Sequence, residues 1–212
     1  MNAVTGVLLA LAGLAAVGNW ISRAIDSRSL EYATKPTVTA LLAVAALTLD
    51  PTTPAMRPWF VAALVLSLLG DVFLMLPGDL FVPGLGSFLL AHVAYVVGFG
   101  VAGLHGGAAL LTLVGVVLVL GPVALRIVRG AREREAALVV PVTLYITVIS
   151  AMIVCAGAST RWIGLVGAVV FAASDSLIAW NRFVRPTPAA SVVIMVTYHL
   201  GQLALLLALL AH

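Results

Sequence analysis

The chain has 212 residues, of which 63% are hydrophobic and 9% are charged, and its formal net charge is +3. Soluble domains are about one quarter charged, so this composition excludes a soluble globular protein and indicates a multispanning membrane protein. The eleven Lys and Arg residues lie between apolar segments, so they indicate membrane topology and no nucleic-acid partner is expected. The single cysteine, Cys155, excludes an intrachain disulfide and a cysteine metal site.

Hydrophobic runs separated by helix breakers predict eight transmembrane helices in a single integral membrane domain, residues 1–212. The predicted spans lie near residues 3–21, 36–50, 58–76, 85–104, 107–128, 136–157, 161–181 and 188–211. The second span follows TKPT, where Pro36 suits the first turn of a helix. After the fifth span, RIVRGAREREAA is typical of a solvated loop. We interpret the first run as a span rather than a cleaved leader, because no basic segment precedes it.

The cations are distributed unequally between the two sides of this topology. An even number of spans places both termini on one side of the membrane. The loops on the opposite side hold nine of the eleven cations, namely Arg23, Arg28, Lys35, Arg126, Arg129, Arg132, Arg134, Arg182 and Arg185. The side that holds the termini has only Arg57 and Arg161. The positive-inside rule then predicts extracytoplasmic termini in a multi-pass protein of the plasma membrane.

Weak internal similarity suggests two parallel four-helix repeats, residues 1–104 and 107–211. Spans 2 and 6 open at a proline (KPTVTALLAV, VPVTLYITVI), and spans 3 and 7 carry an aspartate (LLGDVFLM, AASDSLIA). Spans 4 and 8 carry a histidine (AHVAY, YHLGQ). The Pro-to-Asp separations are 35 and 34 residues, and the Asp-to-His separations are 21 and 24. The order of these features matches in the two halves, as in membrane proteins built from repeats.

Four ionisable residues lie inside predicted spans, where a charged side chain is costly and normally faces the interior of the bundle. They are Asp71, His92, Asp175 and His199. At about 1.5 Å per residue, they lie roughly 7 to 16 Å from the cytoplasmic ends of their helices. Lys35 is expected at the surface of the same leaflet, at the mouth of the second span. We therefore expect one polar site within the cytoplasmic half of the membrane.

Three polar neighbours lie beside the histidines, and several interpretations of the site stay open. Tyr95 is one turn from His92, Tyr198 adjoins His199, and Gln202 is one turn beyond it. Such groups can hold helices together, or relay protons in a proton-coupled carrier of small molecules or lipids. Two Asp and two His residues can also bind zinc. However, no closely spaced ligand pair such as HxxxH occurs, so neither a metal nor another cofactor is expected.

Five motifs resemble, in their order, those of the YhhN-like membrane proteins, a family that includes the mammalian TMEM86 lysoplasmalogenases. They are YATKPTVTALL, LLGDVFLM, FLLAHVAYVVGF, ASDSLIAW and YHLGQ, and they cover the chain from about residue 35 to 203. The resemblance implies a hydrolase that cleaves the vinyl ether of lysoplasmalogen into a fatty aldehyde and a glycerophospho-ethanolamine or -choline. Its partners would be this single-chain ether phospholipid and membrane lipids, and the oligomeric state stays open.

Carried over motif by motif, the resemblance implies a functional set of six residues, namely Lys35, Asp71, His92, Asp175, His199 and Gln202. 

The chemistry of vinyl ether hydrolysis suggests roles for these residues. In this reaction an acid protonates the β-carbon, and an oxocarbenium ion forms before water adds. A pair of carboxyl groups with different proton affinities supplies the acid and a balancing negative charge, as in glycoside hydrolysis. We expect Asp71 and Asp175 to form this pair, with the acid unassigned between them, and His92 or His199 to orient water or move the proton. Lys35 would hold the substrate phosphate, and Tyr95, Tyr198 and Gln202 would line the substrate site.

Overall fold

The computed structural model describes residues 2–188 and 190–211, and every regular element in these residues is helical. The eight α-helices are α1 (Ala3–Ala24), α2 (Arg28–Thr48), α3 (Arg57–Met75), α4 (Phe81–Val101), α5 (Gly106–Arg134), α6 (Val139–Ala158), α7 (Trp162–Phe183) and α8 (Ala190–Leu207). Short 3-10 turns are η1 (Pro54–Met56), η2 (Ala136–Leu138) and η3 (Ala208–Leu210). Helices satisfy their own backbone hydrogen bonds, which lipid cannot do for them.

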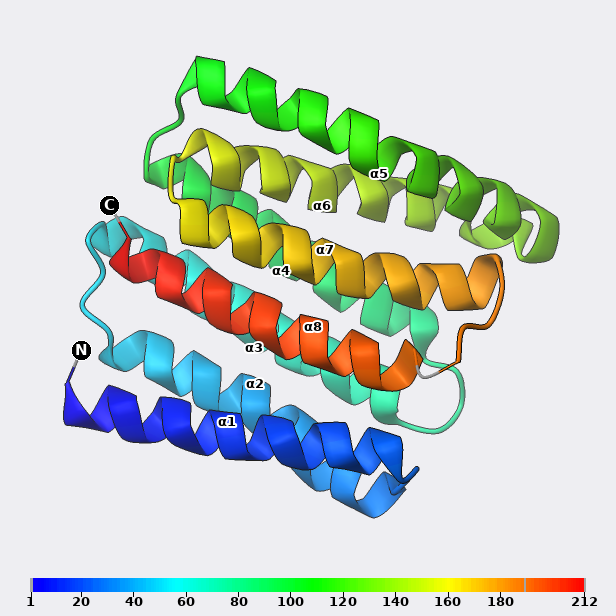
Figure 1. The fold of residues 1–212 in the computed structure, drawn as a ribbon, viewed down its shortest axis with the longest axis horizontal. Coiled ribbons are helices and arrows are strands. Elements are labelled where there is room, and N and C mark those ends of the chain that lie inside the picture. Colours follow the sequence, from blue (N-terminus) through cyan, green and yellow to red (C-terminus); the bar gives the residue numbers. More distant parts are fainter. Residues whose placement is uncertain (1, 189, 212) are drawn as a thin grey trace.

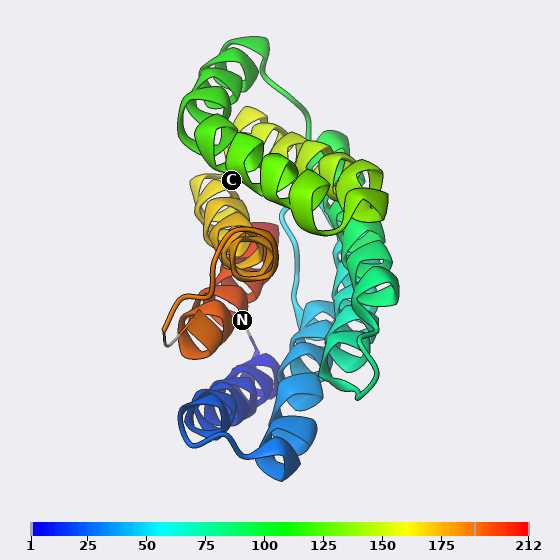
Figure 2. The same cartoon turned by 90° about the vertical axis from the view of Figure 1, so that its right-hand side faces the viewer.

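Seven helices form a closed ring, and α5 lies outside it. Around the ring, α1 packs on α2, α2 on α3, α3 on α4, α4 on α6, α6 on α7, α7 on α8, and α8 on α1. The helix α5 packs against α6 and α7 and is the least buried of the apolar helices. Figure 2 shows the ring end-on, with α5 and α6 (green) opposite α1 and α2 (blue). Polar side chains on the inner faces of this ring are therefore brought together.

Eight transmembrane helices were predicted; the described residues form eight α-helices, of which seven are long and apolar enough to cross a membrane. The helix α2 is not among these seven, although it lies alongside α1 over a similar length (Figure 1). Its first two turns hold Arg28, Glu31 and Lys35, which lower its apolar character. The apolar helices indicate a multi-pass membrane protein.

Two predicted boundaries were wrong. The helix α2 begins at Arg28 rather than at Pro36, so the proline lies inside the helix. The sequence LEYATK before it is compatible with a helix, and hydropathy alone could not detect this polar start. The helix α5 continues to Arg134, so most of the predicted solvated loop is helical. Ile127 and Ala131 of this segment are buried, and their spacing of four residues places them on the same face of the helix, which packs against the bundle.

Connections after α1, α3, α5 and α7 lie at one end of the bundle, whereas both described chain ends lie at the other (Figure 1). The nine cations that the predicted topology assigned to one side lie toward the end with these four connections, which we call the basic end. The bundle therefore places these cations on one side, as the predicted arrangement of loops did. Lys35 was predicted to lie at the membrane surface. It instead lies about 10 Å along α2 from the start of the helix and is only 4% exposed.

Candidate functional site

Asp71 of α3 lies inside the ring and is held by three side chains. The Lys35 Nζ atom lies 3.6 Å from its Oδ1 atom, and both side chains are buried. The Thr39 hydroxyl and the Tyr198 hydroxyl each donate to its Oδ2 atom at 2.7 Å. A carboxylate that faces an ammonium group and accepts two hydroxyl hydrogen bonds is stabilised in its charged form.

A second layer of side chains positions Tyr198. Gln202, one turn along α8, donates from Nε2 to the Tyr198 hydroxyl at 3.3 Å. Tyr95 of α4 donates its hydroxyl hydrogen to Gln202 Oε1 at 2.7 Å. Both residues are fully buried, and the Tyr95 ring packs edge-on against Phe60. Tyr95 and Gln202 therefore contact the Asp71 group through Tyr198.

Asp175 of α7 has a different set of partners. The Tyr145 hydroxyl of α6 donates to Asp175 Oδ2, and His92 Nε2 of α4 lies 3.8 Å from the same oxygen. His92 Nδ1 lies 2.5 Å from the Phe88 carbonyl oxygen, which only accepts, so we assign the ring hydrogen to Nδ1. The Nε2 lone pair then faces Asp175. Neither Lys nor Arg contacts Asp175 within the described residues.

Aromatic rings connect the two carboxylate groups. Phe171 packs against the His92 ring at 4.9 Å between centroids and against the Tyr198 ring at 5.3 Å. Phe88 packs against both Phe171 and Tyr198. The groups of Asp71 and Asp175 are therefore neighbours across a wall of aromatic rings.

Each of the two carboxylates contacts a side chain that comes from the opposite half of the chain. Asp71 and Thr39 belong to the first half, and their partner Tyr198 lies on α8. Asp175 and Tyr145 belong to the second half, and their partner His92 lies on α4. The last helix of each half thus crosses to the carboxylate of the other half.

His199 packs beside Tyr198 but forms no hydrogen bond or ion pair with either carboxylate within the described residues. Its Nδ1 atom accepts a hydrogen bond from Trp20 Nε1 of α1 at 3.1 Å, and the two rings stack. In the neutral ring this leaves the hydrogen on Nε2, which is buried and has no partner within the described residues. His92 and His199 therefore present opposite groups, a lone pair and an N–H donor.

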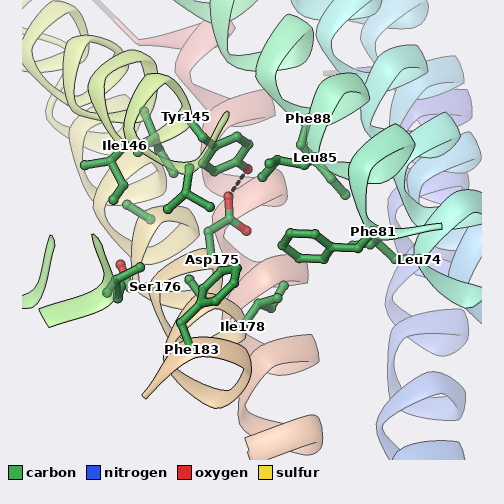
Figure 3. A pocket seen from close by; sticks show the side chains of 15 residues that line it. Leu74, Phe81, Leu85, Phe88, Tyr145, Ile146, Asp175, Ser176, Ile178 and Phe183 are labelled. Carbon is green, nitrogen blue, oxygen red and sulfur yellow. Dashed lines mark hydrogen bonds between the residues drawn. The ribbon is translucent and has the colours of Figure 1, made fainter. Parts of the chain in front are cut away.

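Asp175 faces a narrow apolar pocket of about 60 Å³ at the inner surface of α7. Its walls come from α3 through α7, and they include Leu74, Phe81, Phe88, Tyr145, Ile178 and Phe183. Figure 3 shows the Asp175 carboxylate and the Tyr145 hydroxyl joined among these apolar side chains. An apolar pocket with few polar groups is typical of a site for an apolar ligand.

A polar cleft of about 570 Å³ lies beside this pocket at the basic end. Its lining includes Arg23, Arg28 and Lys35, so the ammonium group that pairs with Asp71 also faces the cleft. Leu74 and Ile178 line both cavities. The cleft and the apolar pocket are therefore adjacent, with these two side chains between them.

Arg182 joins three segments at the rim of the apolar pocket. Its guanidinium donates to both carboxylate oxygens of Asp79 at 2.8 and 3.0 Å and to those of Glu135 at 2.9 and 2.8 Å. It also lies 4.1 Å above the Phe81 ring centroid. These hydrogen bonds lower the pKa of Asp79 and of Glu135 below the usual values. Arg182 thus links the α3–α4 and α5–α6 connections to the end of α7.

The sequence located the buried polar residues but not all their partners. Lys35 and Asp71 are brought together, as are His92 and Asp175, whereas His199 contacts Trp20. Thr39 and Tyr145 were not predicted as site residues, although each follows the proline of its span by one turn. No group of three or more His, Cys, Asp or Glu side chains in residues 2–188 and 190–211 is arranged to hold a metal ion.

Comparison with known proteins connects this chain to a family. Residues 30–209 match the YhhN family. Lysoplasmalogenase TMEM86B of Homo sapiens is 37% identical over 151 residues, which are 70% of this chain and 62% of that protein. A lysoplasmalogenase of Mycobacterium tuberculosis is 35% identical over 157 residues, or 69% of this chain and 58% of that protein. The chain thus spans about three fifths of these relatives. No solved structure matches the chain.

Proposed function

The chain belongs to the YhhN family, and from this premise we propose that it hydrolyses the vinyl ether bond of lysoplasmalogen. The relatives named lysoplasmalogenase support this reaction class. The observation that carries the proposal is Asp175, a carboxyl group in the wall of an apolar pocket that adjoins a cleft lined by three cations, Arg23, Arg28 and Lys35. An apolar chain and a phosphate headgroup need these two environments side by side.

In this proposal Asp175 is the general acid and Asp71 stays ionised. Asp71 faces the Lys35 ammonium group, which keeps it ionised, whereas Asp175 contacts a tyrosine hydroxyl and a histidine lone pair. Only the first carbons of the alkenyl chain need to enter the narrow pocket, and the remainder stays in the bilayer. The negative charge of the Asp71 group helps to balance the cation that forms nearby.

Two proton transfers then convert the vinyl ether into a hemiacetal. Protonated Asp175 gives its proton to the β-carbon of the vinyl ether, and the oxocarbenium ion forms. Water adds to the cation and returns a proton to Asp175, with the His92 Nε2 lone pair as the relay. The resulting hemiacetal breaks into the fatty aldehyde and the glycerophospho product. Tyr145 orients the Asp175 carboxyl group, while Tyr198, Gln202 and Tyr95 position Asp71.

His199 has a separate role in this proposal. Its N–H group, beside Tyr198 and Trp20, suits donation of a hydrogen bond rather than acceptance of a proton. We also propose that the basic end is cytoplasmic and that the site opens to the inner leaflet. The two chain ends would then be extracytoplasmic.

Purified protein incubated with lysoplasmalogen and with its saturated ether analogue tests the proposal. Fatty aldehyde is expected from the vinyl ether and not from the saturated ether. Asp175→Asn should reduce aldehyde release by at least about 100-fold, the range of general acid catalysis, while the protein remains folded. Transport of the intact lipid across proteoliposomes without any aldehyde would instead favour a carrier.

A further inference from the structure

The polar start of α2 forms one wall of the cleft. Arg28, Glu31, Tyr32 and Lys35 are spaced at i, i+3, i+4 and i+7, which places them on one face of the helix. All four residues line the cleft of about 570 Å³. The residues that lower the hydropathy of α2 are therefore the residues that face this cavity.

The charges on this face are not all neutralised by partners. Arg23 of α1 pairs with Glu31 at 2.6 Å, and Lys35 pairs with Asp71. Arg28 is exposed and has no ion-pair partner within the described residues. The cleft thus has a free guanidinium at its rim and a buried ammonium group about 10 Å deeper along the helix.

We propose that this face of α2 is a headgroup site that recognises a phosphate and an ammonium group together. Arg28 and Lys35 hold the phosphate, because a guanidinium fork and an ammonium point charge both suit its oxygens. Tyr32, which is 38% exposed, offers its ring to the ammonium group. This inference rests on the proposed function and specifies how that site selects its lipid.

The position of the cleft fixes where the two parts of the lipid lie. Leu74 and Ile178 separate the cleft from the apolar pocket, so the glycerol and its ether oxygen lie beside these two side chains. Asp175 is one helical turn before Ile178 on α7. A headgroup held on α2 therefore places the reactive carbons near Asp175.

Binding of a saturated ether lysophosphoethanolamine to the full chain in nanodiscs tests the site without any cleavage. The Arg28→Gln and Tyr32→Leu variants should each bind it about tenfold more weakly, the effect of losing one charge-assisted or cation–π contact. Arg28→Lys should recover most of the affinity. Arg129→Gln is the matched control, because Arg129 is an exposed cation of the same end that does not line the cleft.

Competition separates the sources of the phosphate. Soluble glycerophosphoethanolamine should compete with the lipid, whereas an alkylglycerol of the same chain length without phosphate should bind at least about tenfold more weakly than the lipid. Equal affinity of wild type and Arg28→Gln, or equal binding of the alkylglycerol, would overturn the proposal. Competition by inorganic phosphate as strong as that of glycerophosphoethanolamine would also overturn it, because the site would then be one for free phosphate. These outcomes do not depend on whether the vinyl ether is hydrolysed.

Discussion

Replacing Asp71 by asparagine tests the buried ion pair at the centre of the ring. Asparagine keeps an oxygen that can accept from Thr39 and Tyr198, so the substitution removes chiefly the charge. Lys35 is 4% exposed and Asp71 is 1% exposed, so the variant leaves a buried ammonium group without its counter-ion. Removal of one partner of a buried pair typically costs about 3–5 kcal/mol of unfolding free energy.

Unfolding in a mild detergent, followed by tryptophan fluorescence, measures this loss. The double variant Lys35→Met with Asp71→Asn removes both charges and should recover about 2–3 kcal/mol relative to Asp71→Asn alone. Asp50→Asn is the control, because Asp50 is exposed and lies 3.9 Å from Arg57, so its loss should change stability by less than about 1 kcal/mol. A double variant no more stable than Asp71→Asn would refute the ion pair.

Three further substitutions test other parts of the structure. Tyr145→Phe should lower aldehyde release about 10- to 100-fold at nearly unchanged stability, since only the hydroxyl contact is lost; unchanged turnover would exclude the positioning role. Arg182→Gln should destabilise the fold near neutral pH but not in acid, because Asp79 and Glu135 have lowered pKa values and their contribution is lost as pH falls through those values. A stability difference that persists at pH 2 to 3 would contradict this linkage. Gly201→Ala should cost about 1–3 kcal/mol in thermal unfolding, because its Cβ would lie 2.8 Å from a backbone nitrogen of α7; wild-type stability would disprove that close packing.

The sequence predicted the helices and the buried ionisable residues because both depend on local hydropathy. A carboxylate or an imidazole within an apolar run is visible without any knowledge of its neighbours, as for Asp71, His92, Asp175 and His199. The polar start of α2 was missed because Pro36 resembles a first-turn proline, whereas the helix accommodates it in its interior.

The partners of the ionisable residues depend on contacts between distant segments, which sequence spacing does not encode. Asp71 and Tyr198 are 127 residues apart. Tyr145 was missed because a tyrosine in an apolar span is compatible with core packing, and only the fold brings its hydroxyl to Asp175. The predicted contact of Lys35 with the membrane surface failed for the same reason.

The crossing of the last helix of each half has a consequence for how the chain can be divided. A fragment that ends before residue 106 contains Asp71 but lacks Tyr198, and its complement contains Asp175 but lacks His92. Neither fragment holds a finished carboxylate environment by itself. Two fragments produced together would have to associate, as two subunits do, before α8 completes the partners of Asp71 and α4 those of Asp175. The 102–105 connection is thus a natural cut site for fragment complementation, in which activity reports on assembly.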